Sequence, residues 1–260
     1  MNKAANTLST PRAASPSLLR IYWLDMRNEI LRAFRTPIFA LPTLLFPLVF
    51  YIMFGVLLNR GSGAAGSYLL ATYGVFGVMG AALFGFGASV AMERDNGLLR
   101  LRRAMPSPPG AYLIAKLGMA MLFAILISVS LLALAVGLAA VQITPTQALL
   151  LVVVNVMGAL PFAALGLYIG SLASGNGAVA IINLVFLPMA FLSGLWLPLA
   201  MLPGWLATAA PLWPAYHLAQ IALKVIGQDA GQPLWLHIGV LLVFSAVFAT
   251  LARARLARAE

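Results

Sequence analysis

Residues that could carry out covalent or acid–base chemistry are scarce in this sequence. Its 260 residues include two histidines, His217 and His237, and no cysteine. The lack of cysteine excludes a disulfide framework, a thiolate metal site and a cysteine nucleophile, and two distant histidines do not form the HExxH pattern of a metal helix. The lysines Lys3, Lys116 and Lys224 follow no glycine-rich turn, so the GxxxxGK(S/T) loop of ATPases is absent. We therefore expect no catalytic residue, metal or cofactor on this chain.

One pairing could still support nucleophilic catalysis. Ser193 and His237 could act as nucleophile and base on facing helices of an intramembrane serine protease. However, Phe191-Leu192-Ser193-Gly194 lacks the leading glycine of a GxSG signature, and a histidine at the entry of an apolar run is explained more simply by packing. The protease therefore ranks last among the functions considered.

The segment from Glu93 to Lys116, ERDNGLLRLRRAMPSPPGAYLIAK, is a short basic loop between two long apolar runs. It predicts a docking element rather than a binding pocket. A short helix ended by Pro106 is expected here, with three arginines on it: Arg100, Arg102 and Arg103. Glu93 and Asp95 are expected near its start, where negative charge suits the helix dipole. We hypothesise charge complementarity to a protein partner; the alternative is that the arginines hold lipid phosphates and fix the topology.

The composition places the chain among membrane proteins. Hydrophobic residues make up 62% and charged residues 8%, more apolar surface than one soluble core of this length would bury. Crossing a bilayer takes about 20 helical residues, and six uncharged apolar runs are long enough: Ile38–Leu58, Tyr68–Met92, Leu117–Ala140, Ala148–Leu172, Ala178–Leu199 and Leu234–Ala252. We predict an all-α integral membrane protein with six transmembrane helices.

The basic residues predict the orientation of these helices. Of the 16 Lys and Arg residues, all but Arg60 and Lys224 lie before the first run, between the second and third, or after the sixth. The positive-inside rule then puts both termini and the 93–116 loop in the cytoplasm. Topology and anionic lipid headgroups account for the net charge of +10, so no nucleic-acid partner is expected.

The region before the first run divides into two parts. Residues 1–16 are polar and predict a disordered cytoplasmic tail. Residues 17–36 alternate apolar and charged positions at helical spacing, which predicts an amphipathic helix. Its aromatic and charged side chains suit the headgroup region of the membrane: Tyr22, Trp23, Arg27, Glu29 and Arg32. Glu29 and Arg32 are spaced to pair on the helix surface. Membrane anchoring is favoured; contact with a soluble partner is the alternative.

The second run contains a stripe of small residues at four-residue spacing, the pattern that lets helices approach closely in lipid: Gly77, Ala81, Gly85 and Ser89. This stripe could pack within one subunit or between two. We expect it to be a helix-packing surface.

The segment from Pro198 to Pro233 interrupts apolar sequence with prolines that a continuous spanning helix would not tolerate. Short re-entrant helices at the outer interface are expected before the last span. Three tryptophans in and beside this segment suit an aromatic belt at the headgroups: Trp196, Trp205 and Trp213.

Three stretches together resemble the type-2 permease family of ABC transporters (ABC-2 type). The first is Glu93-Arg94-Asp95 with Gly97, the arginine patch, Pro106 and Lys116, although Asp95 stands where the family usually has Glu. The second runs from Leu192 to Ala215 and is similar to the exit of the family's fifth helix and its outer re-entrant segment. The third is the amphipathic helix before the first span. The resemblance covers roughly residues 17–252.

This resemblance implies the membrane subunit of an exporter in the bacterial cytoplasmic membrane. Residues 37–252 would form the permease domain and residues 253–260 a basic cytoplasmic tail. Two permease subunits, identical or paralogous, would each engage a cytoplasmic ATPase that holds ATP and Mg, in a complex surrounded by membrane lipids. The ATPase-coupling residues would be Glu93, Arg94, Asp95, Gly97, Arg100, Arg102, Arg103 and Pro106.

The competing interpretation is a stand-alone secondary carrier or channel. An ion-coupled carrier generally has ionisable groups along its pathway, and none of the six runs contains Asp, Glu, Lys or Arg. This absence favours an external energy source. The transported substrate and the residues that bind it stay unknown at this stage.

Overall fold

The computed structural model describes residues 17–59, 63–104, 108 and 110–258, without the side chains of Arg100, Arg103, Ala257 and Arg258. Within these residues the chain is helical and contains no strand. Six of its helices are long and apolar enough to cross a membrane. The predicted all-α, six-span membrane fold is confirmed.

The spanning helices follow the predicted apolar runs closely. They are α2 (Pro37–Phe50) continued by the π-helix η1 (Tyr51–Leu57); α3 (Gly63–Leu83) continued by the π-helix η2 (Phe84–Ala88) and α4 (Ser89–Asp95); α6 (Ala111–Leu138); α7 (Pro145–Leu172); α8 (Gly175–Leu192); and α11 (Leu234–Arg258). A capping box of Thr144 and Gln147, with Pro145 at the first helical position, begins α7.

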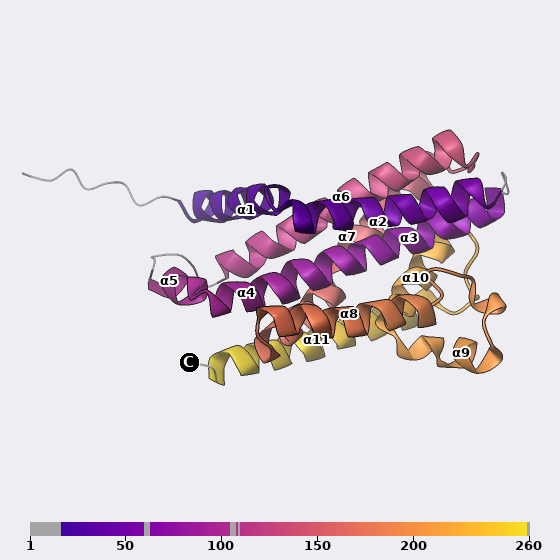
Figure 1. The fold of residues 1–260 in the computed structure, drawn as a ribbon. Helices are drawn as coiled ribbons and strands as arrows, with labels where there is room; N and C mark the ends of the chain where they lie inside the picture. Colours follow the sequence, from indigo (N-terminus) through magenta and orange to yellow (C-terminus); the bar gives the residue numbers. More distant parts are fainter. Residues whose placement is uncertain (1–16, 60–62, 105–107, 109, 259–260) are drawn as a thin grey trace, which may run out of the picture.

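Shorter helices gather at the two ends of the bundle (Figure 1). The amphipathic helix α1 (Leu18–Phe34) and the short α5 (Leu98–Ala104) lie at the end where α11 finishes; we name this the α5 end. At the opposite end, the α10 end, lie η3 (Leu199–Met201), α9 (Gly204–Ala209), η4 (Ala210–Leu212) and α10 (Pro214–Val225). The short helices expected before the last span are therefore present.

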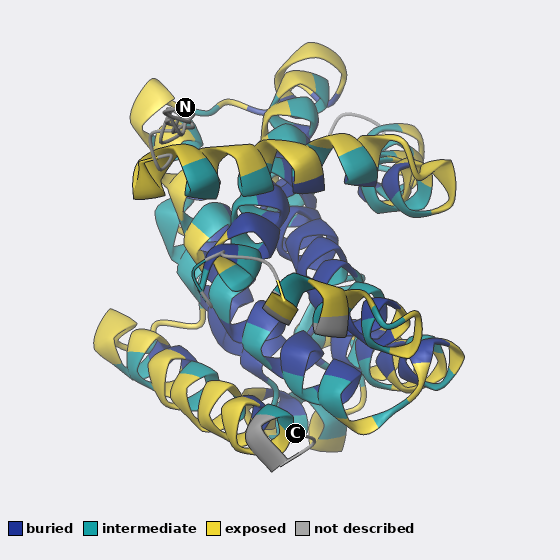
Figure 2. Cartoon of the chain, turned by 90° about the vertical axis from the view of Figure 1, so that its left-hand side faces the viewer, coloured by how far each residue is buried: buried dark blue, intermediate teal, exposed yellow. Residues whose placement is uncertain are grey.

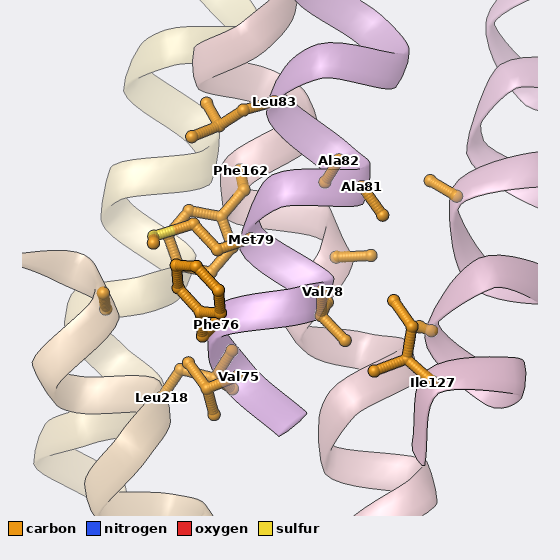
Figure 3. Packing of buried hydrophobic residues seen from close by; sticks show 14 of the residues in the cluster. Val75, Phe76, Val78, Met79, Ala81, Ala82, Leu83, Ile127, Phe162 and Leu218 are labelled. Atoms are coloured by element: carbon orange, nitrogen blue, oxygen red, sulfur yellow. The ribbon is translucent and has the colours of Figure 1, made fainter. Parts of the chain in front are cut away.

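The second spanning helix occupies the middle of the bundle. In its most apolar window 78% of the residues are buried, whereas the corresponding figure for α11 is 6%. Buried residues line the interior and exposed residues the periphery (Figure 2). The side chains of α3 point toward α6, α7 and α10, as Figure 3 shows for three pairs: Val78 with Ile127, Met79 with Phe162, and Val75 with Leu218. The long apolar face of α11 is thus left to lipid.

The small-residue stripe on α3, η2 and α4 faces α6 and α2 within the same chain. A Cβ added at Gly77 would lie 2.8 Å from the Ile127 side chain, and one at Gly85 would lie 3.0 Å from that of Met119. Ala81 is fully buried. These small residues let two spanning helices approach α3 closely.

A close backbone contact joins η2 and the end of α3 to α7. A Cβ on Gly170 would lie 2.5 Å from the carbonyl oxygen of Gly87, and one on Gly166 would lie 2.9 Å from that of Leu83. A backbone oxygen cannot turn aside as a flexible side chain can. These two positions therefore require glycine for a packing reason.

The fifth spanning helix ends earlier than predicted. The fifth run was expected to continue to Leu199, but α8 ends at Leu192. Gly194 has a φ of +75°, its N–H bonds to Phe191 O, and Leu195 N–H bonds to Ala190 O. This arrangement is a Schellman motif, which stops the helix because glycine alone adopts that conformation without strain.

The ends of the second and third spans also differ from the prediction, because they include charged residues. Glu93, Arg94 and Asp95 lie on α4, and Lys116 lies on α6. Glu93 and Asp95 therefore do not begin the arginine-bearing helix; the turn at Asn96 and Gly97 separates them from α5. Charges are tolerated there because they are paired, as described below.

The two ends of the chain were each predicted to form a cytoplasmic tail. Residues 1–16, predicted to be a disordered tail, lie outside the described residues. Within the predicted basic tail 253–260, the helix α11 continues to Arg258, and Arg253 and Arg255 are exposed on it. The basic residues thus extend a spanning helix beyond its apolar part.

Candidate functional site

An ion cluster, formed by Glu29, Arg32, Glu93 and Lys116, joins three helices at the α5 end, and its members are buried except for Arg32. Lys116 of α6 has a side chain with no exposed surface. Its Nζ donates to Glu29 Oε1 of α1 at 2.7 Å and to Glu93 Oε1 of α4 at 3.0 Å, and also to Ser89 Oγ at 2.8 Å. All three ammonium donors therefore have a partner.

Arg32 completes the ion cluster from α1. Its guanidinium pairs with Glu29 at 2.9 Å and also with Glu93. Burial alone would lower the pKa of Arg32, but the two carboxylates raise it above its ordinary value. The hydroxyl of Tyr112 donates to Glu93 Oε2 at 2.6 Å. Two carboxylates and two cations balance, which is the condition under which charges persist inside a protein.

The ion cluster changes the expected role of α1. The Glu29–Arg32 pair forms as expected, but Glu29 is only 5% exposed and faces the bundle instead of the helix surface. Trp23 and Arg27 are exposed and Tyr22 is half-buried. One side of α1 is therefore tied to α4 and α6, while the other remains free for lipid.

Arg94 binds the end of α7. Its guanidinium donates to three backbone carbonyls: Gly170 O at 3.2 Å, Ser171 O at 2.9 Å and Ala173 O at 2.7 Å. The last carbonyls of a helix lack partners within the helix and carry partial negative charge. A guanidinium, with several N–H groups in one plane, is well suited to bind several of them together.

Asp95 binds the start of α8. Its Oδ2 accepts a hydrogen bond of 2.7 Å from the backbone N–H of Gly175, the first residue of that helix. Unpaired N–H groups at a helix start favour a carboxylate. The short turn between α7 and α8, formed by Ala173 and Ser174, is therefore held from both sides by Arg94 and Asp95.

Glu93, Arg94 and Asp95 together are named the bracket. Successive side chains on a helix point about 100° apart, because 3.6 residues make one turn. The three consecutive residues therefore face different neighbours, which are α1 and α6 for Glu93, the end of α7 for Arg94 and the start of α8 for Asp95. One turn of α4 thus fixes the ends of four other helices.

The short helix α5 follows the bracket after a two-residue turn. Gly97 has a φ of +73°, which favours glycine. Arg102 points back into the chain, with its guanidinium 3.7 Å from Asp25 of α1 and 4.9 Å from the centre of the Tyr112 ring. Leu101 is 62% exposed. One face of α5 is therefore tied to the bundle and another is free.

The remaining predicted coupling residues are placed only in part. Arg100 and Arg103 lie on α5, but the direction of their side chains is not described. Pro106 lies outside the described residues; α5 ends at Ala104. Lys116, Ser89 and Tyr112 were not predicted as coupling residues, although Lys116 belonged to the motif that resembles the family and Ser89 to the small-residue stripe.

The residues considered for catalysis lie at the α10 end. His237 approaches His217, with their Nδ1 atoms 2.9 Å apart, and Ser193 Oγ is buried without a hydrogen-bond partner. Across the described part of the chain, no hydrogen bond joins Ser193 to His237, and no three His, Cys, Asp or Glu residues are grouped to hold a metal ion. The geometry offers nothing to support the protease.

Removing Arg94 tests the bracket on the α7 side. We expect Arg94→Met to destabilise the protein by about 1.5–3 kcal/mol, the range for hydrogen bonds to a charged group, because three carbonyls at the end of α7 lose their donor. Arg27→Met, which removes an exposed arginine of α1, is the matched control and should change little. Thermal unfolding in nanodiscs measures both. Equal melting temperatures for the two variants would contradict the role given to Arg94.

Comparison with known proteins gives two similarities. A family model described as "ABC-2 family transporter protein" matches residues 59–254. The chain is also 28% identical over 229 residues to the "Putative transport permease YvfS" of Bacillus subtilis (strain 168), an alignment that covers 86% of this chain and 92% of the relative. The family match includes the bracket, α5 and all spanning helices after the first.

Proposed function

Because this chain belongs to the ABC-2 family of transporter membrane proteins, we propose that it is the permease subunit of an ATP-driven exporter, powered by a separate cytoplasmic ABC ATPase through α5 and the bracket. Family membership implies an ABC ATPase partner and a membrane subunit that is not itself catalytic. The observation that carries the proposal is the bracket, because it connects α5, a short helix with a free face, to five spanning or interfacial helices.

The free face of α5 is the proposed contact with the ATPase. Leu98 is 38% and Leu101 62% exposed, and exposed leucines on a short helix outside the membrane are typical of a protein contact. Arg100 and Arg103 lie on the same helix. Arg102 would instead tie α5 to the bundle, because its guanidinium faces Asp25 and Tyr112. The contact would thus combine an apolar centre with a basic rim.

Movement of α5 would reach the bundle through short, rigid connections. Only Asn96 and Gly97 separate α5 from α4, so displacing one displaces the other. From α4, Glu93 would carry the movement to α1 and α6, and Arg94 and Asp95 would carry it to α7 and α8. Rigid-body displacement of packed helices is a common form of switching transition.

The proposal includes the arrangement of the complex. The α5 end would face the cytoplasm, with both termini, in the bacterial cytoplasmic membrane, because the basic residues concentrate at that end. A second permease subunit would complete the pathway, and two ATPase copies would hold ATP and Mg. Anionic lipids would contact the exposed arginines of α1.

Coexpression with the ATPase tests the proposed contact. We expect the wild-type chain to copurify an ATPase from the same organism, and Leu101→Ser to weaken this association about tenfold or more, the effect of losing a buried leucine contact. Leu138→Ser is the matched control. Leu138 is similarly exposed, at 58%, but it is the last residue of α6 and lies away from α5, so this change should leave the association intact. Arg100→Glu/Arg103→Glu measures the basic rim separately.

The results distinguish the two transport mechanisms. An ATPase whose hydrolysis rate responds to the wild-type permease, but not to Leu101→Ser, supports the exporter. If no ATPase binds and the purified chain alone moves solutes across liposomes, the chain works as a secondary carrier or channel. Thermal unfolding of each variant verifies that the six-helix fold persists.

A further inference from the structure

His217 and His237 form a buried pair at the α10 end of the bundle. His217 lies on α10 and is 3% exposed, and His237 lies on α11 and is fully buried. Their Nδ1 atoms are 2.9 Å apart, close enough for a direct hydrogen bond. The pair is the one imidazole contact among the described residues, and it directly connects α10 to the last spanning helix.

The neighbours of the pair determine which nitrogens carry hydrogen. His217 Nε2 is 2.9 Å from the carbonyl oxygen of Pro211, which can only accept, so this Nε2 bears the hydrogen. In a neutral ring, Nδ1 of His217 is then the acceptor, and Nδ1–H of His237 must donate to it. This leaves Nε2 of His237 as a buried lone pair without a partner.

Other titratable groups near the pair come from few elements. Tyr216 of α10 stands edge-on to both imidazole rings. Lys224 of α10 and Asp229 of the following loop pair with each other at 2.5 Å, and both act electrostatically on His237. The helices α3 and α7, which also contact α10, carry no Asp, Glu, Lys, Arg or His along Gly63–Leu83 and Pro145–Leu172. No carboxylate of these helices therefore compensates a proton on the pair.

We infer that the His217–His237 pair is a proton-sensitive latch, which holds α10 against α11 while both rings are neutral and releases it when the α10 side of the membrane is acidified. This inference does not depend on the ATPase. Its consequence is that acid loosens the segment between α8 and α11, of which α10 is the most buried part.

The chemistry of the two rings explains the release. A first proton must enter the buried pair on the unpartnered Nε2 of His237, because the other ring nitrogens already carry or accept a hydrogen. It creates a charge with no counter-ion in contact with it. A second proton gives both Nδ1 atoms a hydrogen, and two donors then face each other. Strongly interacting sites such as these titrate as a pair.

The sign of the pH dependence follows from burial. Burial lowers the pKa of His217, and the hydrogen bond to Pro211 opposes this only in part. The unfolded chain then binds more protons than the folded one. The stability contributed by the latch is complete above the ordinary histidine pKa of about 6.5. It is lost as the pH falls toward the lowered pKa of His217 in the folded protein.

Hydrogen exchange of the full chain in nanodiscs tests the latch. After correction for intrinsic exchange rates, the amides of α10 should exchange about tenfold faster at about pH 5.5 than at about pH 7.5, because the released state binds protons that the held state excludes. Amides in the middle of α3 should not respond. Unchanged exchange in α10 would overturn the inference.

Two variants identify the responsible groups. His237→Gln keeps an amide that can donate to His217 but removes one titrating ring, and it should reduce the pH response of α10 at least several-fold. Asp229→Asn removes the nearest carboxylate, leaves the pair intact and should keep the response. If Asp229→Asn abolishes the response while His237→Gln retains it, the Lys224–Asp229 ion pair is the sensor instead and the latch is refuted.

Discussion

Replacing Lys116 by methionine is expected to destabilise this protein by about 3–5 kcal/mol, the range measured when one partner of a buried ion pair is removed. Methionine has a length similar to that of lysine, so the substitution leaves little empty space and little destabilisation comes from a cavity. The loss is electrostatic, because Glu29 and Glu93 would remain buried with only Arg32 to balance them. A melting temperature lowered by on the order of 10 °C in nanodiscs would be the measured result.

Two further variants separate charge from packing. Adding Glu93→Gln to Lys116→Met leaves one carboxylate with one guanidinium, so part of the stability should return. Lys224→Met is the matched control, because Lys224 also pairs with a carboxylate but its side chain is 32% exposed. Such a surface pair contributes about 0–1 kcal/mol. Similar melting temperatures for Lys116→Met and Lys224→Met would show that the ion cluster does not hold the helices together.

Replacing Gly170 by alanine is expected to separate η2 from α7 at the base of the bracket. The new methyl group would lie 2.5 Å from Gly87 O, so the two backbones must move apart. Overpacking of this kind costs about 1–3 kcal/mol. The shift would also disturb the carbonyl of Gly170, which accepts from Arg94. We therefore expect both a lower melting temperature and weaker coupling of the permease to ATP hydrolysis.

Gly239 on α11 provides the control for this prediction. An alanine there would meet nothing within 4 Å, and alanine forms helix better than glycine by about 1 kcal/mol. Gly239→Ala should therefore leave the protein equally or more stable. If Gly170→Ala is as stable as Gly239→Ala, the close contact between η2 and α7 does not exist in the membrane.

The bracket shows how far the sequence alone could lead toward the site. The motif at Glu93, Arg94 and Asp95 was identified as important, and its connection to a short basic helix was predicted. The structure adds that these three side chains bind other helices of the same chain. The sequence could not show this, because Glu29, Glu93 and Lys116 are far apart along the chain.

The two histidines illustrate the same limit. They lie 20 residues apart, on two helices joined by a loop, and nothing in their spacing indicated a contact. Ser193 and His237 were paired in the sequence analysis by chemistry alone, and the structure gives His237 a different neighbour. Contacts between helices depend on the rotation of each helix about its axis, which residue types at one position do not reveal.

The class of the protein, the number of its spans, the basic loop at one end and the proline-rich segment at the other could all be predicted from the sequence. These are local properties, because an uncharged apolar run of sufficient length enters a membrane whatever its neighbours are. The tertiary structure decided which faces meet, including the glycine contact of α7 with η2 and the ion cluster. In lipid, a side facing the bilayer and a side facing another helix are equally apolar. Periodicity therefore could not orient α3 or α7, and only the assembled bundle shows what each of them touches.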